Sequence, residues 1–98
     1  IMIIEFRDQG TEDVFNGTNT KAARKRCPRQ IWNVAQRKLD QIDSATTLED
    51  LAVPPGNRLE ALSGNRAGQH SIRINDQYRI CFVWTDSGPT QVEITDYH

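Results

Sequence analysis

The 98-residue sequence has few of the features that mark specialised protein classes. It has no apolar run approaching the roughly twenty residues that cross a bilayer, which excludes a membrane-spanning helix and argues against a membrane partner. Its two cysteines, Cys27 and Cys81, are too few for a disulfide framework and too far apart for a Cys-x-x-Cys metal or redox pair. We interpret both as buried free thiols of a cytosolic protein.

A large excess of either charge is also lacking. Twelve Lys plus Arg against thirteen Asp plus Glu give a net charge of −1, which argues against a protein that coats nucleic acid indiscriminately. The only histidines are His70 and His98, and no His, Asp and Glu residues have metal-ligand spacing, so neither a metal nor another cofactor is expected. The apolar start is interrupted by Glu5 too early for a signal peptide. We therefore expect one cytoplasmic domain over residues 1–98.

The first half of the chain predicts helices after a short strand. Residues 3–6 fit a strand and residues 11–15 fit one or two helical turns, whereas the basic segment 21–26 follows a polar loop and is polar enough to be mobile. Apolar residues then recur at helical spacing after Pro28 and predict an amphipathic helix of about four turns: Ile31, Ala35, Leu39 and Ile42. Thr46-x-x-Glu49 is a capping-box signature that predicts another short helix.

The spacing of apolar residues changes after Val53-Pro54-Pro55-Gly56, which ends the helical half. From there the two-residue alternation typical of strands predicts four of them: 58–62, 70–74, 78–85 and 90–96. The order is a strand, helices and then strands in hairpin succession. It predicts an α+β domain whose N-terminal helices pack on one face of a mainly antiparallel sheet of about five strands.

The same alternation predicts the register of the hairpins, because a one-residue slip would move a whole hydrophobic set into solvent. A three-residue connection at 75–77 pairs Arg73 with Arg79. A loop at 86–88 aligns the last strand so that Tyr97 projects to the same side. The face of the sheet opposite the core is therefore predicted to hold two arginines and a tyrosine close together.

Two arginines directly opposite each other on antiparallel strands repel. In one interpretation both guanidinium groups extend into water or pair with Glu93 and Asp76. In the other, an anion such as phosphate lies between Arg73 and Arg79. If the second is correct, Arg79→Ala should lose activity while remaining at least as stable as the parent.

Basic residues are concentrated in part of the chain. Eleven of the twelve lie between Lys21 and Arg79, and the span 21–38 contains seven of them and no acidic residue: Lys21, Arg24, Lys25, Arg26, Arg29, Arg37 and Lys38. A solvated helix face is the ordinary explanation. A docking surface for nucleic acid or an acidic partner is the alternative.

The second half resembles the HigB (plasmid-maintenance killer) branch of the RelE toxin superfamily in three stretches: PGNRLEALSGNRAGQHSI at 55–72, YRICF at 78–82, and the terminal DYH at 96–98. The likeness spans essentially the whole chain. It implies a microbial RNase-type fold and ribosome-dependent cleavage of messenger RNA in the A site. It also implies a HigA-like helix-turn-helix antitoxin, through which alone the protein would contact operator DNA.

The resemblance further implies roles for individual residues. Arg79 matches the arginine that holds the substrate phosphate in this family, and Asp96, Tyr97 and His98 match its C-terminal catalytic group. Arg66 matches a basic loop residue that binds substrate. The other candidate substrate-binding residues are Arg58 and Arg73, since a guanidinium group offers paired donors to phosphate oxygens.

The expected reaction is metal-independent attack of an RNA 2′-hydroxyl on the adjacent phosphate, which needs a base, an acid and a cation. His98 suits either proton-transfer role near neutral pH. Tyr97 can stack on a base or donate its hydroxyl proton, and Asp96 either orients His98 or caps the strand. His70, by contrast, is predicted to face the core opposite Phe82.

The sequence departs from the family pattern at two positions. Ser63 stands where many relatives have lysine, and Glu60 stands where some have histidine. Because a lost lysine weakens neutralisation of the phosphate, we expect a slow or mild toxin. Two alternatives to RNA cleavage are open: inhibition by binding alone, as the related ParE branch inhibits DNA gyrase, and action as a co-repressor of its operon.

Overall fold

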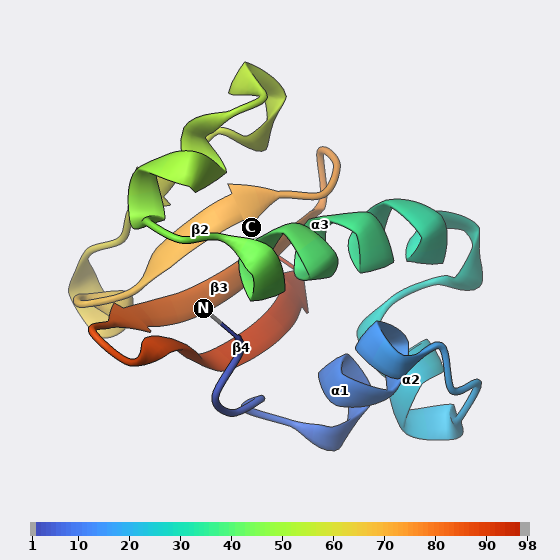
Figure 1. Cartoon of the computed structure of the whole chain (residues 1–98). Coiled ribbons are helices and arrows are strands. Elements are labelled where there is room, and N and C mark those ends of the chain that lie inside the picture. Colours follow the sequence, from blue (N-terminus) through green and yellow to red (C-terminus); the bar gives the residue numbers. More distant parts are fainter. Residues whose placement is uncertain (1, 97–98) are drawn as a thin grey trace.

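Residues 2–96 are described by the structure, a computed structural model in which helices precede an antiparallel sheet (Figure 1). The helices are α1 (Gln9–Asn16), α2 (Lys21–Arg26) and α3 (Trp32–Ser44), and short 3-10 turns are η1 (Arg29–Ile31), η2 (Leu48–Ala52), η3 (Pro55–Asn57) and η4 (Gly64–Arg66). The sheet has the spatial order β1 (Glu60–Ala61), β2 (His70–Arg73), β3 (Tyr78–Thr85) and β4 (Gly88–Asp96). No helix among the described residues is long and apolar enough to cross a bilayer.

Helices α1 and α2 pack against each other at one end of the molecule (Figure 1). Thr20 caps α2 by accepting a hydrogen bond from a backbone N–H, and Arg26 pairs with Asp8 at 3.2 Å. Close approach is possible because Gly10 has no Cβ, which would lie 2.4 Å from the carbonyl oxygen of Ala22. The sequence left open whether the segment 21–26 is ordered, and the cap and this contact make it a docked helix.

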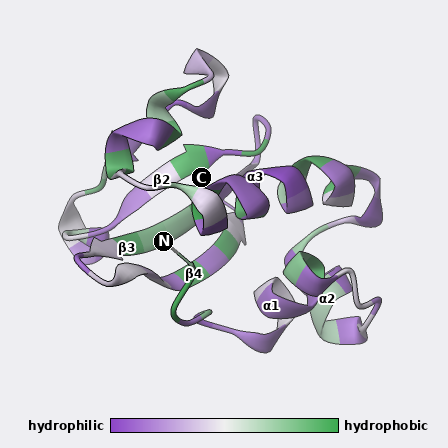
Figure 2. Ribbon diagram, viewed as in Figure 1, coloured by the Kyte–Doolittle hydropathy of each residue, from purple (hydrophilic) through white to green (hydrophobic). Residues whose placement is uncertain are grey.

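Helix α3 lies across one face of the sheet and confirms the predicted amphipathic helix (Figure 1). Its side chains Ala35, Leu39 and Ile42 are fully buried in one cluster with apolar residues of β2, β3 and β4. The regular helix begins at Trp32, after the 3-10 turn η1, rather than at Pro28. Figure 2 shows hydrophobic segments along β3 and β4 beside α3, and hydrophilic segments along the outer turns.

The short elements after α3 differ in detail from the predicted ones. The capping box uses Thr47 and Asp50, one position beyond the predicted Thr46 and Glu49, and it opens a 3-10 helix. Asp50 accepts hydrogen bonds from the backbone N–H groups of both threonines at 3.0 Å, so its carboxylate fixes the start of η2. One further 3-10 turn, η3, follows within the segment expected to end helical structure.

Two predicted strands are shorter in the structure. The strand expected at 58–62 is reduced to β1, because Arg58 has a left-handed backbone with φ of 48°. The strand expected at 3–6 makes a single parallel bridge between Phe6 and Val92, supported by nearby backbone hydrogen bonds to β4. Among residues 2–96 the sheet therefore has four strands with one added bridge, in place of about five.

The hairpin register confirms the prediction where it matters for function. Arg73 pairs with Arg79, and the end of β4 pairs with β3 as expected. The predicted last turn is one residue too long, because Thr85 pairs with Gly88. A bulge that includes Gln91, whose φ is 50°, compensates for this difference and restores the predicted register.

Candidate functional site

Arg79 lies on the face of the sheet opposite the core, which also holds Arg73 and Glu93 and is called the polar face below. It is only 8% exposed, and its Nε donates a hydrogen bond to Ser71 Oγ at 2.8 Å. Its Nη2 donates to the carbonyl oxygen of Arg58 at 2.7 Å and lies 3.1 Å from Glu60 Oε1. These contacts fix the plane of the guanidinium group on the sheet.

The carbonyl that accepts from Arg79 belongs to a residue held by a buried network. Arg58 follows Asn57, whose side chain is fully buried and donates to the backbone carbonyl of Leu51 at 3.0 Å. Lys38 of α3 donates to the amide oxygen of Asn57. Helix α3 therefore fixes, through Lys38, the turn in which the left-handed Arg58 presents its carbonyl.

The repulsion between the paired arginines is relieved by separate acidic partners. Arg73 pairs with Asp76, as one interpretation expected. Arg79 pairs with Glu60 rather than with Glu93, whose carboxylate instead contacts arginines farther along the sheet. Acidic side chains therefore pair with both arginines, as the first interpretation expected, but Glu60 takes the place predicted for Glu93. A phosphate between the arginines stays a prediction.

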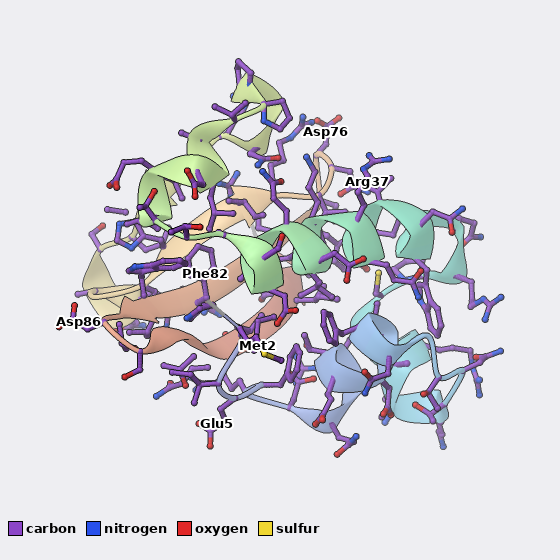
Figure 3. The ribbon with its side chains drawn as sticks, viewed as in Figure 1. Met2, Glu5, Arg37, Asp76, Phe82 and Asp86 are labelled. Carbon is purple, nitrogen blue, oxygen red and sulfur yellow. The ribbon has the colours of Figure 1, made fainter. Side chains whose placement is uncertain are left out.

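Three of the predicted substrate-binding residues line one hollow at the end of the sheet. This first hollow has a volume of about 260 Å³, and its lining residues are Arg58, Arg73, Asn75, Asp76 and Arg79. Figure 3 labels Asp76 in the turn between β2 and β3, which marks this end of the sheet. Next to the first hollow, Arg79 and Arg58 also line a shallow opening together with Glu60. The arginine cluster thus adjoins two carboxylates, those of Asp76 and Glu60.

Arg66, also predicted to bind substrate, lies elsewhere on the same face. Its Nη1 donates to Glu93 Oε1 at 2.7 Å and to Gln69 Oε1 at 3.0 Å. It lines a separate hollow that shares no residue with the first one. The structure therefore divides the predicted basic residues between two places.

The C-terminal group is described only in part. Asp96 pairs in register with Tyr78, and its carboxylate accepts a hydrogen bond from Gln77 Nε2 at 2.9 Å. It thus lies beside the turn that borders the first hollow. Tyr97 and His98, predicted to be catalytic, lie outside the described residues.

Glu60 is a site residue that the sequence did not identify as one. Its departure from the family pattern was visible, but its contact with Arg79 was not, because β1 is too short to predict a register. Its side chain is 53% exposed, so the carboxylate meets both solvent and the buried guanidinium group. Such a carboxylate can exchange protons with a bound substrate.

The two cysteines are buried free thiols, as predicted. Burial raises the pKa of the Cys27 thiol to about 11. Burial also raises the pKa of Cys81, although the charges of Arg66 and Arg79 oppose that shift. Neither thiol is therefore a nucleophile near neutral pH. Among residues 2–96, no group of three or more His, Cys, Asp and Glu side chains is arranged to hold a metal ion.

The basic segment 21–38 belongs to the helical layer, and Figure 3 labels Arg37 there, on α3. Several of its residues have partners within the protein. Arg29 lies 4.6 Å over the ring of Trp32, and Arg24 donates to the Asn19 side chain. These contacts favour an ordinary solvated helix surface over a docking surface.

Comparison with known proteins identifies close relatives of the chain. The family model described as the RelE-like toxin HigB of type II toxin-antitoxin systems matches residues 4–98. Toxin HigB-1 of Vibrio cholerae is 41% identical over 85 residues, which cover 87% of this chain and 86% of that protein.

Solved structures resemble the fold at lower sequence identity. The YoeB-YefM complex from Staphylococcus aureus contains a chain with a TM-score of 0.62 and 20% identity, covering 100% of this chain and 97% of that one. A heterotetrameric YoeB-YefM toxin-antitoxin complex from the same organism gives a TM-score of 0.56 at 19% identity, with the same coverage. The predicted RelE-like α+β fold is thereby confirmed.

Proposed function

The chain belongs to the HigB-like toxins, the RelE-like toxins of type II toxin-antitoxin systems, and from this premise we propose that it is an endoribonuclease that cuts messenger RNA on the ribosome. The observation that supports this most is the convergence of Arg58, Arg73 and Arg79 around one hollow on the face of the sheet opposite the core. Three guanidinium groups in one place favour a phosphate ligand.

The arginines would hold and stabilise the reacting phosphate. Arg79 is fixed by Ser71 and the Arg58 carbonyl, so little reorganisation of its guanidinium group accompanies the reaction. Arg73 lies on the neighbouring strand, and its pairing with the highly exposed Asp76 can exchange for a pairing with phosphate. Both guanidinium groups then stabilise the negative charge that develops on the phosphorane.

Two proton transfers complete the proposed reaction. The Glu60 carboxylate accepts the proton of the 2′-hydroxyl as its oxygen bonds to phosphorus, and His98 donates a proton to the 5′-oxygen as the bond between phosphorus and that oxygen breaks. The products are a 2′,3′-cyclic phosphate and a 5′-hydroxyl. Asp96 would orient His98, and Tyr97 would stack on an adjacent base.

The charges around this site predict a slow enzyme. Ser63 supplies no positive charge where many relatives have lysine, and Glu60 partly neutralises Arg79. We expect slowed translation and growth rather than rapid killing. The protein would act in the cytoplasm, where a HigA-like helix-turn-helix antitoxin neutralises it and provides its only contact with operator DNA.

A second candidate function is inhibition or co-repression by binding without cleavage. The observation that favours it is the extensive engagement of Arg79 by its own protein, which is typical of a structural arginine. In that case the polar face would bind a partner and no message would be cut.

Mapping the 5′ ends of cellular messages separates these two functions. After induction of the parent chain we expect new ends in phase with codons, and after induction of His98→Ala at equal protein level we expect none. Growth inhibition without new ends in either culture would support the binding function and contradict the proposal. Circular dichroism of the purified variant controls for loss of folding.

A further inference from the structure

The polar face of the sheet has a second hollow, of about 340 Å³, which the proposed reaction does not use. Among the described residues, those that line it carry charged or amide side chains: Arg7, Asn65, Arg66, Gln69 and Glu93. They come from three separate parts of the chain, which are the segment before α1, the η4 loop and β4. This second hollow therefore depends on the tertiary fold and on no single motif.

Glu93 organises the second hollow. It is 7% exposed, its Oε1 lies 2.7 Å from Arg66 Nη1, and its Oε2 lies 3.7 Å from Arg7 Nε. A buried carboxylate is costly unless cations pair with it, and here Arg66 donates a hydrogen bond to Glu93 while Arg7 lies at ion-pair distance. Two guanidinium groups against one carboxylate leave a net positive charge in the second hollow.

The groups in the second hollow mostly donate hydrogen bonds. Arg7 contacts Glu93 through Nε, and its side chain is 53% exposed, which leaves its terminal nitrogens at the solvent side of that contact. Gln69 accepts from Arg66 through its oxygen, which leaves its amide nitrogen as a donor. A guanidinium group and an amide match the two acceptors, O6 and N7, that guanine presents along one edge.

The second hollow lies about one nucleotide away from Arg79, which would hold the reacting phosphate. Glu93 pairs directly with Cys81, which is two residues from Arg79 on the same face of β3. Two residues along a strand span about 7 Å. One nucleotide of an extended RNA strand can bridge a distance of this size.

Resting on the proposed function, we propose that the second hollow binds the nucleotide next to the scissile phosphate and favours guanine there. Arg7 is the residue that reads the base, and Glu93 is the positioning residue that holds it. The chain thereby has a base preference set by its own side chains, in addition to any preference imposed by the ribosome.

Cut-site mapping of Arg7 variants tests this inference. The parent should cut preferentially beside guanine, on the order of tenfold over adenine at one flanking position. Arg7→Gln and Arg7→Lys should both lose this preference, because lysine keeps the charge but lacks the paired donors. Arg37→Gln on α3 removes the same charge from the other layer and should leave the preference unchanged.

Three results of the mapping would overturn the inference. They are a parent without guanine preference, an Arg7→Gln variant with the parent's preference, and an Arg7→Gln variant whose cuts all fall by one factor whatever the base. The last result would identify Arg7 as a phosphate contact.

A binding measurement makes the inference independent of cleavage. The side-chain amide NMR signals of Asn65 and Gln69 should shift saturably with a non-cleavable deoxydinucleotide containing guanine and much less with its adenine counterpart. Arg7→Gln should abolish the difference. If the parent cuts no message but these shifts occur, the proposed function fails and the base site stands; equal shifts for both dinucleotides overturn the base site alone.

Discussion

At the scale of single residues, Arg79 has structural contacts as well as a proposed catalytic one. Removing its side chain leaves Ser71 Oγ, the Arg58 carbonyl and the Glu60 carboxylate without their donor. The sequence-based expectation that Arg79→Ala is at least as stable as the parent therefore no longer holds. We predict that urea unfolding will show a loss of about 1–3 kcal/mol for this variant. A variant as stable as the parent would contradict these contacts.

Glu60 can be tested by a substitution that preserves its shape. Glu60→Gln keeps an oxygen that can accept from Arg79, but it removes the proton acceptor. We predict that cleavage of ribosome-bound message falls about a hundredfold, as expected for loss of a general base, with unchanged melting.

The matched control for this variant is Glu5→Gln, since Glu5 is exposed and lies away from the site (Figure 3). It removes the same charge and should retain parental cleavage. If Glu60 only neutralises Arg79, Glu60→Gln should instead cleave faster than the parent.

Asp13 provides a residue whose protonation affects stability. Hydrogen bonds from Thr20 and then Gln9 lower the pKa of Asp13 below its ordinary value of 3.8. Because the pKa of Asp13 is lower in the folded protein, its ionised carboxylate stabilises the fold above pH 3.8. This stabilisation is lost as the pH falls through the folded pKa.

The test compares urea unfolding of the parent and Asp13→Asn along an acid titration. The advantage of the parent should shrink as the pH falls below the ordinary pKa of the carboxyl group. A difference in unfolding free energy that stays constant down to strongly acidic pH would contradict this assignment.

At the scale of elements, the spacing of apolar residues predicted the long helix and the long strand. The short elements depend instead on tertiary contacts. The stripe through Ala35, Leu39 and Ile42 and the alternation along 78–85 each extend over enough residues to define a helix and a strand. By contrast, the short helix at 21–26 depends on packing against Gly10, which lies outside its own sequence.

The candidate site was predictable to the same extent. The pairing of Arg73 with Arg79 followed from alternation alone, because both hairpin strands have an apolar face. The contact of Arg79 with Glu60 depends on the left-handed backbone of Arg58, which no local pattern of a non-glycine residue indicates. Likewise, Arg7 reaches Glu93 only because the N-terminal segment runs beside β4.

The packing of α1 on α2 leads to a prediction at this scale. A Cβ at Gly10 would lie 2.4 Å from the Ala22 carbonyl oxygen, so Gly10→Ala must push the two helices apart. We predict a loss of unfolding free energy of about 1–3 kcal/mol. Gly56→Ala is the control, since nothing lies within 4 Å of its added Cβ, and it should be close to neutral in the same urea titration.

At the scale of the whole molecule, the net charge is close to zero, but the two faces of the sheet differ in character. Helix α3 and the core residues cover one face of the sheet, while the other face holds the two polar hollows with their arginines. Among residues 2–96, the arginines of this face gather at separate hollows and form no continuous basic surface along the sheet. Such a local arrangement of arginines suits an RNA strand that the ribosome already holds better than RNA bound directly from solution.

The most direct test of the proposed function uses purified ribosomes programmed with a defined message and an empty A site. The parent chain should cut the message within the A-site codon and leave a 5′-hydroxyl on the downstream fragment, while the same message without ribosomes stays intact. A folded parent chain that leaves the programmed message uncut, or that cuts both messages equally, would contradict a ribosome-dependent endoribonuclease.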